Sequence, residues 1–131
     1  MTGFTLKKEE RLCSQKVLGE LFTSGESFLV YPLKVVFLKT ESPQPFPVQA
    51  SCAVSKRNLK RAVKRNLLKR RMREAYRLNK PAFYDELAAI ELHIAAMFIF
   101  IGKDIVEFAT IEKSMILALK KIMSKVKENN S

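Results

Sequence analysis

Apolar residues recur at helical spacing near both ends of the chain. A helix from residue 14 to about residue 23 would bury one face, formed by Val17, Leu18, Leu21 and Phe22. Gly25 follows just past the end of that helix, where glycine is preferred. A second helix, capped by Thr110, would bury a longer stripe, made of Ile111, Met115, Leu119, Ile122 and Val126. Both helices therefore need an apolar surface to pack against.

Three intervening stretches have the pattern of β-strands. Residues 27–40 are rich in β-forming residues, although Pro32 interrupts the run and indicates a bend or an edge position. Residues 48–55 place Val48, Ala50, Cys52 and Val54 on one face and leave a small, polar face that could meet solvent or a ligand. Residues 92–101 include a run that is apolar on both faces, which is typical of a central strand.

A long amphipathic helix is predicted from about Leu59 to Pro81, because this stretch is rich in helix formers and lacks glycine and proline. At roughly 100° per residue, one face would collect Leu68, Met72, Ala75 and Leu78. The opposite face would collect Asn66, Lys69, Arg70, Arg73 and Arg77. Arg71 falls near the apolar side, and we expect its stem to follow the core edge with its head in water. Pro81 is expected to end the helix, with a short helix over residues 82–90 after it.

Residues 56–80 carry the whole net charge of the protein. They hold 12 of the 24 Lys and Arg residues and one of the 13 acidic residues, so the net charge of +11 resides in them. Such a concentration marks a site for a polyanion. A merely solvated surface is the weaker interpretation, because the cations repel one another, and a membrane-surface helix would need bulkier apolar residues opposite them. Nucleic acid is the leading prediction, and charge alone does not separate DNA from RNA.

Other reactive residue types are sparse, which argues against a catalytic site in this chain. Cys13, Cys52 and the single histidine, His93, cannot assemble a zinc site, and the four glycines include no phosphate-binding motif. We expect reduced structural cysteines, no metal site and no catalytic residue. The length predicts a single domain over residues 1–131. No signal sequence or membrane-spanning segment is visible, which predicts a cytoplasmic protein with no membrane partner.

The motif from Val54 to Glu74, VSKRNLKRAVKRNLLKRRMRE, resembles the signature of the bacterial ribonuclease P protein component. In that family a small apolar strand precedes a Lys-rich loop and then Arg-Asn-Arg-x-x-Lys-Arg-x-x-Arg-Glu on a helix. The chain departs from the pattern at Leu67, where the family has arginine, and at Arg71, where an apolar residue is usual. Upstream, Arg11, Leu12, Leu18, Phe22 and Gly25 resemble the family's first helix, although Leu18 replaces an aromatic residue.

The resemblance implies an α+β fold. It would be a two-layer α/β sandwich with a four-stranded mixed sheet and helices, in the order α-β-β-β-α-β-α. The crossover through the basic helix would be left-handed, against the general rule. The family assists a catalytic RNA that removes the 5′ leader of precursor tRNA. This implies an endoribonuclease holoenzyme in which the RNA subunit carries out the hydrolysis with Mg²⁺, which that RNA mainly binds. The implied partners are the catalytic RNA and precursor tRNA, with no organic cofactor and no obligate protein partner.

The resemblance also implies two sets of site residues. The set for the catalytic RNA is Lys56, Arg57, Lys60, Arg61, Lys64, Arg65, Asn66, Lys69, Arg70 and Arg73. A leader-binding cleft between the sheet and the first helix would have a floor of Leu18, Phe22 and Phe37 and a rim of Lys8, Arg11 and Lys16. Core packing is an equally good interpretation of Phe22 and Phe37. The alternative function is a non-catalytic RNA-binding or RNA chaperone protein of ribosomal type, and a DNA-binding structural protein is a third possibility.

Overall fold

The elements follow the predicted order along the chain. A computed structural model describes residues 15–40 and 48–129. Its helices and strands are α1 (Gln15–Ser24), β1 (Glu26–Val30), β2 (Leu33–Thr40), β3 (Val48–Val54), α2 (Ala62–Ala89), β4 (His93–Phe100) and α3 (Phe108–Asn129). The order α-β-β-β-α-β-α and the α+β class are thus confirmed. Pro32 lies between β1 and β2, where the predicted bend occurs. No helix within the described residues is long and apolar enough to cross a membrane.

The four strands form one mixed sheet in the order β1-β2-β4-β3. The strand β2 pairs antiparallel with both β1 and β4, whereas β3 pairs parallel with β4, from Val48 opposite Ile94 to Val54 opposite Phe100. The parallel pair is connected through α2, as predicted, and the left-handed sense of that crossover stays a prediction. Because β3 and β1 are the outer strands, β4 is central, as its apolar sequence indicated.

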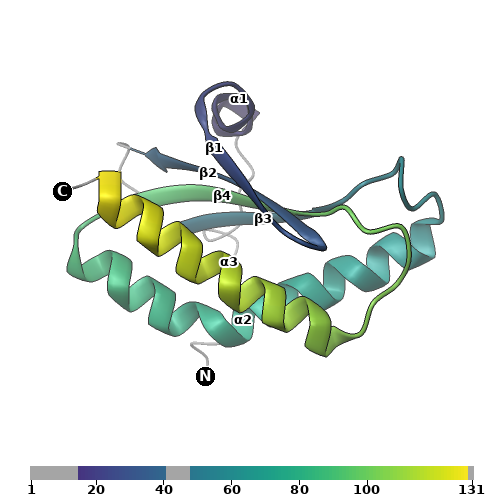
Figure 1. The fold of residues 1–131 in the computed structure, drawn as a ribbon. Helices are drawn as coiled ribbons and strands as arrows, with labels where there is room; N and C mark the ends of the chain where they lie inside the picture. Colours follow the sequence, from purple (N-terminus) through teal and green to yellow (C-terminus); the bar gives the residue numbers. More distant parts are fainter. Residues whose placement is uncertain (1–14, 41–47, 130–131) are drawn as a thin grey trace.

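Helices lie on both faces of the sheet (Figure 1). On one face, α2 packs against β3 and β4, α3 packs against β1 and β2, and the two helices pack against each other. On the other face, α1 packs against β2 and β4. The main body is therefore the predicted two-layer sandwich, and α1 adds a partial layer over β2 and β4 on the other side.

The main core lies between the sheet and the pair α2 and α3. Leu33, Val35 and Phe37 of β2 point into it, as do the alternate residues of β4 from Ile94 to Phe100. The predicted stripe of α3, Ile111, Met115, Leu119, Ile122 and Val126, is buried at every position. A smaller cluster on the α1 side contains Leu21, Val36 and Ala95, with Leu38, Met97 and Ile99 against it.

Gly25 lets the chain turn from α1 into β1. Its amide donates to the Leu21 carbonyl oxygen at 3.0 Å. A Cβ at this position would lie 2.5 Å from the Leu21 oxygen and 3.0 Å from the Phe37 oxygen, both fixed backbone atoms. The predicted position of glycine just past the helix therefore has a steric reason, because no side chain fits there.

Three predictions about the helices were wrong. Pro81 does not end α2, which continues to Ala89 and is drawn as a bent helix in Figure 1. A proline removes one backbone N–H and disturbs one turn, but burial of Phe83 and Leu87 holds the turns that follow. Leu78, predicted on the buried face of this helix, is 41% exposed, and Tyr76 is buried instead. Finally, α3 begins at Phe108, so Thr110 lies within it instead of capping it.

Candidate nucleic-acid interface

The loop between β3 and α2 presents four cations to solvent. Lys56, Arg57, Lys60 and Arg61 are exposed, whereas Leu59 between them is buried with 4% of its surface accessible. The Leu59 amide donates to the Ser55 carbonyl oxygen at 3.0 Å, and the Ser55 amide donates to that of Phe100 at 3.1 Å. A buried apolar anchor and backbone hydrogen bonds therefore direct the charged side chains outward. We call residues 56–61 the basic loop.

A second group of cations lies on the outer face of α2. Arg70, Arg73 and Asn66 are exposed and Lys69 is half-buried, on the side of the helix turned away from Leu68 and Met72. Within the described part of the chain, none of these cations forms an ion pair. The helix α2 packs against β3, an outer strand of the sheet, so this face lies near that edge. We call Asn66, Lys69, Arg70 and Arg73 the outer basic face.

Other basic residues of α2 are engaged within the protein. Lys64 lies 3.9 Å from Asp104. Arg71 donates from Nη1 to the Val106 carbonyl oxygen at 2.5 Å, so its head binds the connection between β4 and α3 instead of water, and that prediction was wrong. Arg77 forms an ion pair with Glu74 and lowers the pKa of that carboxyl, chiefly by hydrogen bonding. The cations of residues 56–80 are thus not equivalent.

Arg65 also turns toward the protein. Its Nη1 donates to the carbonyl oxygens of Leu59 at 2.9 Å and of Lys60 at 2.6 Å. The predicted RNA-binding set therefore contains two residues with protein contacts, Lys64 and Arg65. The remaining members are Lys56, Arg57, Lys60, Arg61, Asn66, Lys69, Arg70 and Arg73. These lie together on the basic loop and the outer basic face.

Electrostatics at the start of α2 favour an anion. The first turn of the helix contains no acidic residue, and the N-cap residue, Arg61, makes no side-chain capping hydrogen bond. The positive end of the helix dipole therefore adds to the field of the surrounding cations. A phosphate group is the chemical species that such a field attracts.

Comparisons with known proteins decide the family. The ribonuclease P family model matches residues 6–123. A ribonuclease P protein component from Porphyromonas gingivalis is 35% identical over 123 residues, covering 94% of this chain and 90% of the relative. One from Chlorobium phaeobacteroides is 40% identical over 106 residues, covering 72% of each. This chain belongs to the ribonuclease P protein family.

Solved structures agree with that family assignment. The ribonuclease P protein of Staphylococcus aureus superposes with a TM-score of 0.69 at 20% identity, covering 86% of this chain and 94% of the other. The protein from Thermotoga maritima gives a TM-score of 0.65 at 25% identity, covering 86% and 96%. The shared fold accounts for the mixed sheet with α2 and α3 packed on one face.

The departures from the ribonuclease P motif have different surroundings. Leu67, at the position of the motif's third residue, is half-buried, next to the fully buried Leu68. Arg71 bonds to Val106 and thereby links α2 to the start of α3. Arg71 therefore lies with Lys64 on the side of α2 that contacts the connection between β4 and α3. It does not belong to the outer basic face.

The residues predicted for the leader-binding cleft are only partly within the described region. Lys8 and Arg11 lie outside it, and for Lys16, Leu18 and Phe22 it covers the α1 backbone but not the side chains. The prediction for Phe37 was wrong. It is 4% exposed and lies in the main core, with its ring centroid 6.1 Å from that of Phe28. Alternation along β2 sends Phe37 to the face opposite α1.

The sheet face beside α1 has a different lining from the floor predicted for the cleft. Its half-buried residues are Gln49, Ser51 and Ala53 of β3 with Met97 and Ile99 of β4. The register places Ser51 opposite Met97 and Ala53 opposite Ile99. The sequence signal was the small, polar alternate face of residues 48–55. We call these five residues the open sheet face.

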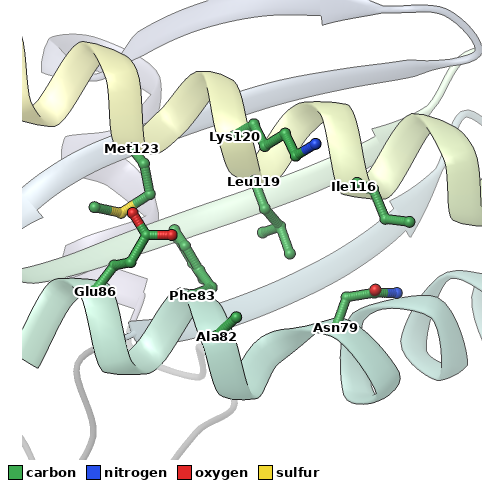
Figure 2. A pocket seen from close by; sticks show the side chains of 8 residues that line it. All are labelled: Asn79, Ala82, Phe83, Glu86, Ile116, Leu119, Lys120 and Met123. Carbon is green, nitrogen blue, oxygen red and sulfur yellow. The ribbon is translucent and has the colours of Figure 1, made fainter.

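A pocket of about 160 Å³ lies between α2 and α3, away from the basic surfaces (Figure 2). Its floor is apolar, with Phe83, Leu119 and Met123, and its rim includes Glu86 and Lys120. Glu86 also pairs with Lys127 at 3.2 Å. Over residues 15–40 and 48–129, no three His, Cys, Asp or Glu side chains are grouped to hold a metal ion.

Cys52 is expected to be unreactive in the folded protein. Burial raises the pKa of its thiol to about 12, although nearby Arg73 acts in the opposite direction. The nucleophilic thiolate is therefore almost absent at pH 8. Iodoacetamide labelling followed by peptide mapping should leave Cys52 unmodified in native protein and label it in urea. Rapid labelling of native Cys52, at the rate seen in urea, would contradict this expectation.

Proposed function

We propose that this chain binds the RNA subunit of ribonuclease P and, with it, removes the 5′ leader of precursor tRNA. The observation that carries the proposal is the surface formed by the basic loop and the outer basic face. Its cations have no protein carboxylate as partner within the described chain, and the sequence outside residues 56–80 is charge-balanced. The phosphate backbone of a folded RNA supplies the missing counter-charge.

The second part of the proposal concerns the substrate. We infer that the single-stranded leader runs along the open sheet face. Met97 and Ile99 would contact bases, and Gln49 and Ser51 would supply hydrogen bonds. The basic residues Lys8, Arg11 and Lys16 remain candidates for its rim, and Leu18 and Phe22 for its floor. This face adjoins β3, whose edge lies beside the outer basic face, so one RNA assembly could contact both surfaces.

The proposal assigns the hydrolysis to the RNA subunit. Mg²⁺ would be bound mainly by that RNA. The protein's contribution would be to neutralise phosphates, which lowers the concentration of Mg²⁺ that the RNA needs to fold and to hold its substrate. A cytoplasmic location and a single domain over residues 1–131 stay predictions.

Reconstitution tests this function. The purified protein would be mixed with ribonuclease P RNA from the same organism and a precursor tRNA at a low Mg²⁺ concentration at which the RNA alone is slow. We expect the protein to accelerate release of the intact 5′ leader. RNA-free protein should release none, as checked after nuclease treatment and repurification.

Two outcomes would contradict the proposal. Tight binding of the RNA without faster leader removal would indicate an RNA-binding or chaperone protein of ribosomal type. Cleavage by rigorously RNA-free protein would overturn the assignment of the chemistry to RNA. Competition with duplex DNA of equal length controls for binding that depends on charge alone.

A further inference from the structure

The start of α2 is an unfavourable place for cations. Lys60, Arg61, Lys64 and Arg65 crowd the positive end of the helix dipole, with no acidic residue in the first turn and no side-chain cap. Like charges and the dipole both favour spreading this segment apart. Some other interaction must therefore hold the basic loop in one conformation before any RNA is present.

Arg65 supplies such an interaction. Its Nη1 donates to two backbone acceptors, the Leu59 carbonyl oxygen at 2.9 Å and the Lys60 carbonyl oxygen at 2.6 Å. A guanidinium group is suited to this because its donors are rigid and always charged. The carbonyl oxygens that it binds are the negative ends of peptide dipoles, so they offset part of the local positive charge.

Asn58, within the basic loop, ties it to the sheet. Its Nδ2 donates to the carbonyl oxygen of Ile101, just past β4, at 2.6 Å. The backbone N–H of Asn58 donates to the Ser55 hydroxyl oxygen at 3.4 Å. Between the two ties, buried Leu59 fills the core. Residues 58–60 of the basic loop are thus fastened through uncharged acceptors on the protein itself.

We propose that Arg65 is a positioning residue which, with Asn58, presets the basic loop for RNA. In this role Arg65 holds Lys60 and Arg61 in their binding arrangement and is not itself a phosphate ligand. The inference rests on the proposed function, and it changes the role assigned to the first arginine of the Arg65–Glu74 motif. A preset loop binds more tightly because less conformational freedom is lost on association.

The salt dependence of RNA binding separates positioning from direct contact. Each phosphate contact contributes a slope of about 0.7–0.9 to the plot of log affinity against log salt. Arg65→Ala is expected to weaken binding of ribonuclease P RNA by roughly three- to tenfold with little change in slope. Arg70→Ala, which removes the same charge from the outer basic face, should flatten the slope by one contact. Equal flattening by the two variants would overturn the proposal.

Hydrogen exchange of the free protein gives a readout that does not need RNA. Amides of residues 58–61 should exchange faster in Arg65→Ala than in the wild type or Arg70→Ala. Asn58→Ala, which changes no charge, should resemble Arg65→Ala in both exchange and slope. Unchanged exchange in both variants would overturn the preset loop. A wild type that fails to bind RNA would instead reject the proposed function and leave the exchange result intact.

Discussion

Replacing both Arg70 and Arg73 with alanine is expected to cause the largest loss of RNA affinity among the predicted variants. Both side chains are exposed on the outer basic face, and within the described residues neither has an ion-pair partner. Losing two phosphate contacts should flatten the salt slope by roughly 1.4–1.8 and weaken binding about 100-fold at low salt. Filter binding or anisotropy over a series of KCl concentrations would measure both quantities.

A matched control removes the same charge elsewhere. Lys113 and Lys120 are exposed on α3, and their double replacement with alanine lowers the net charge by the same amount. If RNA binding depends on where the charges lie, this control keeps nearly the wild-type salt slope. Equal flattening in the two double variants would contradict the assignment of the outer basic face, because net charge alone would then explain the binding.

Phe98→Ala is expected to cause the largest loss of stability. Phe98 is fully buried in β4, one of the two inner strands, and its ring centroid lies 5.6 Å from that of Tyr76 on α2. Truncation removes buried apolar surface and leaves a cavity where the sheet meets α2, at a cost of about 3–5 kcal/mol. Urea denaturation followed by circular dichroism would give the change in the free energy of unfolding.

Leu117→Ala serves as the comparison for Phe98→Ala. Leu117 is 47% exposed on α3, so its truncation leaves no enclosed cavity and should change the free energy of unfolding by within about 0.5 kcal/mol. A loss below about 1 kcal/mol for Phe98→Ala would contradict the central position of this ring in the core.

Periodicity predicted the parts of the fold that depend on local pattern. The buried stripe of α3 and the central position of β4 follow directly from apolar spacing, and both were confirmed. The course of α2 past Pro81 could not be predicted in the same way. Proline lowers helix propensity locally, but the burial of Phe83 and Leu87 outweighs that penalty, and this burial depends on tertiary packing.

The candidate interface was predictable as a segment but not residue by residue. Charge concentration identified residues 56–80. Which cations remain available depends on Asp104 and Val106, which lie in the distant connection between β4 and α3. Phe37 shows a second limit, because β2 is apolar on both faces and its alternation does not say which face meets α1.

The hydrogen bond from Asn58 to Ile101 spans 43 positions of sequence. A contact of that separation forms only after the chain between its ends has been made and ordered, so it belongs to the slower part of folding. During synthesis the basic loop emerges from the ribosome well before β4 does. The tie to the sheet therefore completes late, and until then the nascent chain carries the cations of the basic loop without this hydrogen bond. Final shaping of the loop would coincide with completion of the domain.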